Sequence, residues 1–171
     1  MASFSVTNNH YLRVIYTGNT DIIKKADRED KSNSRLTKAD STALHKALAR
    51  LSEYDFDGVK DDNESRKKDF YNTMKAFSDA YNYTLESGSA SQNESIAKLT
   101  KKMKQLSSKN ADDLEDFGIT FDEKGYMNVR KSAIDNISTS KYKDWVGKDS
   151  EYAKELSEIS KQMSRHVDIT L

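Results

Sequence analysis

The sequence predicts a mainly α protein, an elongated antiparallel helical bundle or coiled coil with one small β-hairpin at about residues 119–129. The 171 residues include no proline, so no residue breaks a helix by removing a backbone N–H group. Charged residues make up 33% of the chain and apolar residues 35%, which favours helices that each bury one stripe. Apolar residues also recur at helical spacing through most of the chain.

The first 34 residues are expected to form an extended or flexible arm. A strand-like run at 11–16 is followed by a turn at Gly18 and by a polar stretch at 26–35. Residues 35–171 are expected to form one helical bundle domain into which the hairpin is inserted. Its first helix should begin with a capping box of Thr37 and Asp40 and end near Gly58.

The strongest helical pattern covers about residues 62–86. Its apolar residues are spaced by four, three, four and four, as in the seam of a coiled coil: Phe70, Met74, Phe77, Tyr81 and Leu85. Residues 87–89 are expected to break this helix, and an S-x-x-E capping box at Ser91 and Glu94 should start the next one. A short Gly/Ser turn between two such helices predicts that they fold back on each other as antiparallel neighbours.

A last helix is predicted at about residues 149–166. Its seam consists of Tyr152, Leu156, Ile159, Met163 and Val167. Such a seam packs either within its own bundle or against a helix of another subunit. The sequence does not distinguish these two cases, so the first four residues of the seam are candidate interface positions. Trp145, the single tryptophan, precedes this helix and is either a core residue or an exposed interface anchor.

The hairpin is predicted from two short alternating runs around a turn. Ile119 and Phe121 precede the turn, and Met127 and Val129 follow it. Gly118 can supply the left-handed residue that lets the chain leave a short helical turn before the hairpin. Because a two-stranded hairpin is marginally stable by itself in water, we expect it to pack against the helices.

The order of the motifs resembles the carboxy-terminal part of the flagellar filament cap family, also called hook-associated protein 2. A helix ending in F-x-x-A-Y-N is followed by a helix with a leucine seam and then by a G-I-x-x-x-x-x-G hairpin, over about residues 65–165. The residues that match are Phe77, Ala80, Tyr81, Asn82, Gly118, Ile119 and Gly125, with Val129, Ala133 and Ile134 after them. Phe117, Lys124 and Arg130 depart from the family pattern, which has leucine, aspartate and aspartate there.

This resemblance implies a non-enzymatic, self-associating axial or cap-like protein that is exported through the flagellar secretion apparatus without a cleaved signal. Full members of the family are several times longer and carry separate globular domains. The alternative function is that of a cytoplasmic helical adaptor or an export-chaperone-like module that binds one discrete partner. The partners expected are therefore proteins, including a second copy of the chain, outside the cell under the first reading and in the cytoplasm under the second.

Several functional classes are disfavoured by composition. The 28 basic and 28 acidic residues are mixed along the chain, so no basic face for nucleic acid is expected. The chain has no cysteine, its histidines lack metal-ligand spacing, and no G-x-S-x-G elbow is present. No membrane-spanning run or secretory signal is recognised. We therefore expect no catalytic residue, metal or cofactor, and no membrane insertion.

Overall fold

The structure is a computed structural model that describes residues 28, 31–56 and 64–167. It confirms the mainly α fold with one small β-hairpin. Most of the predicted arm, including the run at 11–16, lies outside the described residues, as does Gly58. The elements follow one another in the order α3 (Asn33–Ser52), α4 (Glu64–Ser89), α5 (Glu94–Lys109), α6 (Ala111–Asp116), β1 (Ile119–Phe121), β2 (Met127–Val129), α7 (Lys131–Asn136), η2 (Thr139–Tyr142), α8 (Lys143–Val146) and α9 (Glu151–Arg165).

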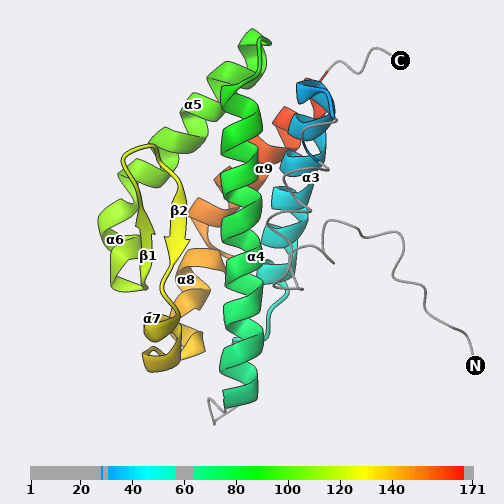
Figure 1. Ribbon diagram of the computed structural model, residues 1–171. Coiled ribbons are helices and arrows are strands. Elements are labelled where there is room, and N and C mark those ends of the chain that lie inside the picture. Colours follow the sequence, from blue (N-terminus) through cyan, green and yellow to red (C-terminus); the bar gives the residue numbers. More distant parts are fainter. Residues whose placement is uncertain (1–27, 29–30, 57–63, 168–171) are drawn as a thin grey trace, which may run out of the picture.

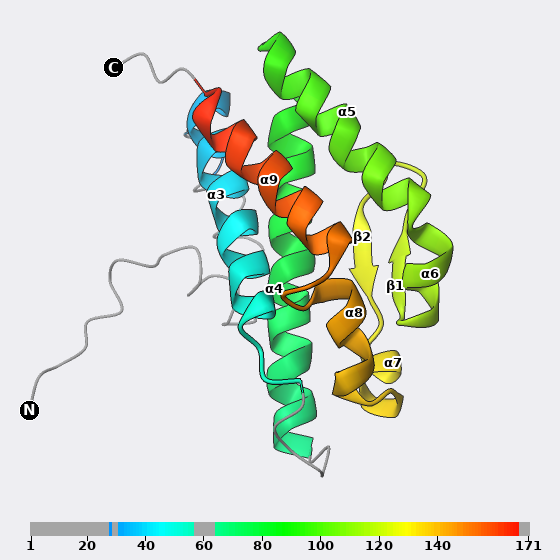
Figure 2. The same cartoon turned by 180° about the vertical axis from the view of Figure 1, so that it is seen from behind.

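The four long helices pack around one shared core. Helix α3 contacts α4 and α9, and α5 also contacts α4 and α9, so each long helix has two long neighbours. In Figure 1 the chain descends α3, ascends α4, descends α5 and ascends α9. Figure 2 shows the same arrangement from behind, with α9 crossing in front of α4. Neighbouring helices therefore run in opposite directions, the arrangement favoured when connections are short.

The short elements between α5 and α9 hold the hairpin against the bundle. Strands β1 and β2 are antiparallel, with Ile119 opposite Val129 and Phe121 opposite Met127. Strand β2 packs against α4, while β1 packs against α6. The hairpin predicted from sequence is thus confirmed, and it lies on the side of α4 away from α3 (Figure 1).

The core is built from the predicted apolar seams. All five seam residues of α4 are at most 1% exposed, and most of those of α5 and α9 are buried against them. Two stripe residues are only half-buried: Leu99, between Ile96 and Met103 on α5, and Val167, at the end of the last stripe. The fully buried Tyr142 of η2 joins this core, with its ring centroid 4.9 Å from that of Phe70. No described helix combines the length and apolarity needed to cross a membrane.

Both predicted capping boxes are wrong in position. Helix α3 begins at Asn33, with Ser32 as its N-cap, because the Ser32 hydroxyl accepts a hydrogen bond from the Arg35 N–H. Thr37 and Asp40 lie inside the helix and are buried. The predicted bundle boundary at residue 35 therefore falls two residues inside α3. Serine serves as an N-cap as well as threonine does, so the earlier residue starts the helix.

The cap of α5 is Asn93, two residues after the predicted Ser91. The Asn93 Oδ1 accepts hydrogen bonds from the N–H groups of Ser95 at 2.9 Å and Ile96 at 3.3 Å. The Ser91 hydroxyl instead accepts from the Asn93 N–H at 3.3 Å, which stabilises the turn before the helix. Asparagine is among the best N-cap residues, and here it displaced the serine as the cap.

The predicted helix break at residues 87–89 is also wrong. Helix α4 continues through Ser89, and both Ser87 and Gly88 are buried within it. A Cβ atom at Gly88 would lie 2.4 Å from the Thr100 Oγ1 and 2.9 Å from the Met163 Cε. Glycine at this position therefore allows α5 and α9 to approach α4 closely, and the burial gained there outweighs its weak helix propensity.

Candidate functional site: the hairpin dock on α4

The outer edge of β2 is bound by side chains of α4. The Asn82 Nδ2 donates a hydrogen bond to the Met127 carbonyl oxygen at 2.8 Å, and the Asn82 Oδ1 accepts one from the Met127 N–H at 2.7 Å. The Ser78 hydroxyl, one helical turn earlier, donates to the same carbonyl at 2.9 Å. We call this set, Ser78, Asn82 and the backbone of Met127, the hairpin dock. The Asn82 amide takes the place of a neighbouring strand.

The strand register explains why Met127 is the residue that is bound. The Arg130 N–H donates to the Gly118 carbonyl, and the Asp122 N–H donates to the Tyr126 carbonyl. Because hydrogen bonding alternates along antiparallel strands, the Met127 N–H and carbonyl point away from β1. Met127 is 3% exposed, so these backbone groups need partners within the protein. Asn82 supplies both a donor and an acceptor for them.

Two glycines shape the ends of β1 and β2. Gly118 has a φ of 75° and Gly125 has a φ of 87°, both in the left-handed region. The Gly125 N–H donates to the Asp122 carbonyl at 2.9 Å, which closes the turn. A Cβ atom at Gly118 would lie 2.1 Å from the Ala133 Cβ, so α7 rests directly on this glycine. Gly118 is thus required for conformation and for space.

The remaining motif residues pack beneath the hairpin. Phe77, Ala80 and Tyr81 are at most 2% exposed, and Ile119 is fully buried. The Tyr81 ring centroid lies 5.9 Å from that of Phe121, in an edge arrangement that joins α4 to β1. The hairpin is therefore held by the hydrogen bonds of the hairpin dock at the strand edge and by apolar contacts below it.

A group of buried hydroxyls lies where α4, α5 and α9 meet. The Ser107 and Tyr152 hydroxyl oxygens are 3.2 Å apart. Loss of solvation raises the pKa of Tyr81 to about 12, and the Ser107 hydroxyl partly opposes this shift. Desolvation, together with the neighbouring Tyr81, raises the pKa of Tyr152 above that of Tyr81. These phenols remain protonated near neutral pH, so they act as uncharged structural groups in the core.

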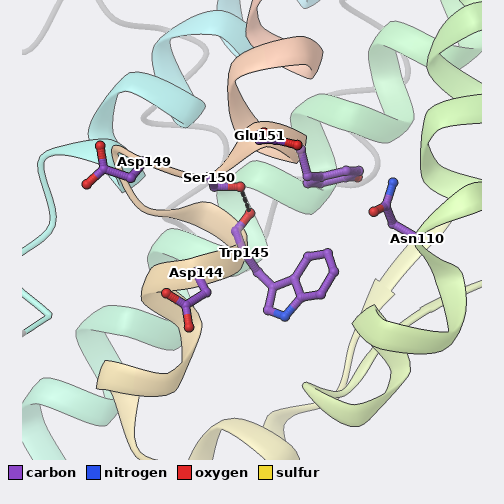
Figure 3. A pocket seen from close by; sticks show the side chains of 7 residues that line it. Asn110, Asp144, Trp145, Asp149, Ser150 and Glu151 are labelled. Atoms are coloured by element: carbon purple, nitrogen blue, oxygen red, sulfur yellow. Dashed lines mark hydrogen bonds between the residues drawn. The ribbon is translucent and has the colours of Figure 1, made fainter.

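Trp145 lines a pocket of about 310 Å³ at the start of α9, together with Asn110, Asp144, Asp149, Ser150, Glu151 and Tyr152. In Figure 3 the Trp145 ring and the Asn110 side chain lie on opposite sides of the hollow, whereas the carboxylates of Asp144 and Asp149 point away from the ring. The Ser150 hydroxyl donates to the Trp145 carbonyl at 2.6 Å and accepts from the Ala153 N–H, so it caps α9. The acidic groups therefore do not converge in this pocket.

Trp145 itself is half-buried, with its ring centroid 6.0 Å from that of Phe117. It packs at the edge of the core. Trp145 is therefore neither a fully buried core residue nor a fully exposed interface anchor, the two alternatives predicted from the sequence. The four candidate interface residues of the last helix, Tyr152, Leu156, Ile159 and Met163, are at most 4% exposed and lie on a helix packed against α3 and α5. The seam of α9 is therefore used inside the chain.

Sequence reasoning named Asn82 as a motif residue but did not predict its task, and it missed Ser78 and Tyr142. The Tyr142 hydroxyl donates to the Phe117 carbonyl at 2.9 Å, next to the glycine that starts the hairpin. One signal was present: asparagine and serine are poor helix formers, so their placement four residues apart inside a strong helix indicates tertiary hydrogen bonds.

Among the described residues, no group of three or more histidine, aspartate or glutamate side chains is placed to bind a metal ion. Comparisons with protein-family models, curated proteins and solved structures give no match for this chain.

Proposed function

We propose that this protein is a non-enzymatic structural or interaction protein, similar to flagellar cap or hook-associated components, that acts by associating with other protein chains. The observation that carries the proposal is the contact of Asn82 with Met127. The F-x-x-A-Y-N helix and the G-I hairpin are separate in sequence, yet they form one unit in space. A shared structural task for both motifs supports a common origin with the family that they resemble.

The surface used for association has to lie outside the apolar seams, because those seams are buried within the chain. Helix α5 exposes five basic side chains, at Lys98, Lys101, Lys102, Lys104 and Lys109. The next helix, α6, exposes four acidic ones, at Asp112, Asp113, Glu115 and Asp116. Opposite charges on consecutive helices allow the basic face of one copy to attract the acidic helix of another.

Sedimentation velocity over a wide range of protein concentration tests this proposal. We expect a concentration-dependent shift from monomer to larger species that weakens as salt is raised, because exposed charges are screened beyond about 10 Å at 0.1 M ionic strength. The double variant Lys98→Glu/Lys101→Glu should reduce self-association. Its matched control is Lys38→Glu/Lys46→Glu on α3, which makes the same change in charge at exposed lysines elsewhere.

A chain that stays monomeric at every concentration and captures no protein from an extract of its source cells would contradict the proposal. Equal effects of the two double variants would reject the α5 surface as the site of contact. A monomer that captures one discrete protein would favour the second reading, a helical adaptor or export-chaperone-like module. Binding of that protein should then protect backbone amides of α5 or α6 from hydrogen exchange.

A further inference from the structure

A guanidinium group is bound in a recess between α3 and α4. Arg28 directs its two terminal nitrogens at the two carboxylate oxygens of Asp40, at 2.9 and 3.0 Å. The same guanidinium lies 4.3 Å from the centre of the Tyr83 ring. Glu86, at the rim, is 3.5 Å from one of these nitrogens. The arrangement offers a planar cation two parallel acceptors, an aromatic face and a second negative charge.

The carboxylate at the centre of the recess, that of Asp40, is buried. Asp40 is 0% exposed, and no other aspartate or glutamate in the described part of the chain is buried. A buried carboxylate without a partner is strongly destabilising, whereas one paired with a forked guanidinium has both oxygens satisfied. Asp40, Tyr83 and Glu86 all belong to the bundle, and only the cation comes from outside it.

The cation comes from the segment that precedes α3. Arg28 lies four residues before the N-cap Ser32, and the Lys31 N–H donates to the Arg28 carbonyl at 3.1 Å. Asp40 lies seven residues into α3, about 10 Å along the helix axis at 1.5 Å per residue. To reach it, Arg28 must lie beside the first two turns of α3, so its ion pair fixes where the chain enters the bundle.

We propose that Asp40, Tyr83 and Glu86 form an arginine-binding socket and that Arg28 is its ligand within the same chain, holding the chain at residue 28 against α3 and α4. The ligand class is a guanidinium. Its planar fork donates two parallel hydrogen bonds to the two carboxylate oxygens, whereas an ammonium group is a compact point charge without this geometry. Arg28 is 16% exposed and Glu86 57% exposed, so the socket opens to solvent at its Glu86 side.

Chemical rescue in the full-length chain tests the socket. Arg28→Ala should lower the melting temperature by about 5–10 °C, because it leaves the Asp40 carboxylate buried and unpaired. Ethylguanidinium at about ten times its dissociation constant should then restore about 3 °C. The wild-type chain should gain nothing, and the matched ammonium probe, ethylammonium, should restore much less. Arg28→Lys should resemble Arg28→Ala more closely than the wild-type chain.

The variant Asp40→Asn separates the socket from a general effect of charge. In the background of Arg28→Ala it removes the buried charge, so the double variant should be more stable than Arg28→Ala alone and should not respond to ethylguanidinium. Equal responses of the wild-type chain and Arg28→Ala to this probe would overturn the proposal. So would a double variant that is less stable than Arg28→Ala.

A measurement on the wild-type chain guards against a variant that fails to fold. Nitrogen-15 NMR of the arginine side chains should show that the terminal N–H groups of the Arg28 guanidinium rotate slowly and give separate signals, because both are held by Asp40. Asp40→Asn should merge these signals, whereas Lys38→Glu should leave them. Averaged terminal signals for Arg28 of the wild-type chain would overturn the proposal. Contacts between Arg28 of a labelled copy and Tyr83 of an unlabelled copy would overturn its assignment to the same chain.

Discussion

The side-chain amide of Asn82 binds both backbone groups of Met127, with its nitrogen 2.8 Å from the carbonyl oxygen and its oxygen 2.7 Å from the N–H. The two residues lie 45 positions apart in the chain. Together with Ser78, this side chain fixes β2, the strand that packs on α4, to the bundle. A hairpin of this size gains its stability from such contacts because it has too few strand hydrogen bonds of its own.

Asn82→Ala should lower the free energy of unfolding by about 2–3 kcal/mol, since two hydrogen bonds are lost and the N–H group of the buried Met127 is left without a partner, while its carbonyl keeps the bond from Ser78. Urea unfolding would measure the loss, and the Met127 amide should exchange with solvent much faster. The matched control is Asn72→Ala, which changes a half-buried asparagine of the same helix and should cost less than about 0.5 kcal/mol. Similar costs for both variants would contradict the role given to the hairpin dock.

Gly118→Ala should be far more harmful than Gly125→Ala, although both glycines have positive φ. At Gly125 a Cβ would meet no atom closer than 3.8 Å, so only backbone strain of about 1–2 kcal/mol is expected. At Gly118 the clash with the Ala133 Cβ should add further destabilisation of about 1–3 kcal/mol. The double variant Gly118→Ala/Ala133→Gly should recover part of the stability lost through that clash. Urea midpoints that show no recovery would reject the contact as the cause.

Fluorescence of Trp145 should report a half-buried indole. Its emission maximum is expected between those of a fully buried and a fully exposed tryptophan, with partial quenching by acrylamide, because the ring packs against Phe117 on one side and lines the pocket on the other. Trp145→Phe should cost less stability than Trp145→Ala, since it keeps an aromatic contact. Emission like that of free tryptophan in the folded chain would contradict this packing. A blue shift at high protein concentration would instead place Trp145 in a contact between copies.

Alkaline pH should destabilise the protein through its buried tyrosines. Burial raises the pKa values of Tyr81 and Tyr142 to about 12, above the usual 10, and that of Tyr152 is raised as well. Above pH 10 the unfolded chain loses these protons while the folded chain keeps them, so stability falls as pH rises. By pH 12, Tyr81 alone should account for a loss of about 2 kcal/mol.

Absorbance at alkaline pH, together with circular dichroism, would test this expectation. The three buried phenols should ionise only as the helical signal disappears. Tyr152→Phe removes one ionising group and should shift the alkaline midpoint upward, with Tyr126→Phe, a half-buried residue of the hairpin, as the control. Ionisation of all tyrosines near pH 10 in a chain that remains folded would contradict their burial.

Much of the fold could be predicted from the residues themselves. The α4 and α9 seams predicted those helices because helical spacing places such residues on one face, and both faces are buried. The alternation around Gly125 predicted the hairpin. The helix starts at Thr37 and Ser91 were wrong because several neighbouring residues offer the same capping chemistry. Only the positions of the helices decide which one is used.

The sequence by itself determined that this protein is mainly α, with amphipathic helices and one hairpin, because these follow from local spacing, the lack of proline and two glycines suited to turns. Tertiary structure decided what the polar residues of the helices do. The sequence pattern assigned Asn82 to a family motif and Asp40 to a capping box, but each lies on a face that meets another part of the chain. Their hydrogen bonds, to Met127 and Arg28, depend on distances that sequence spacing does not encode.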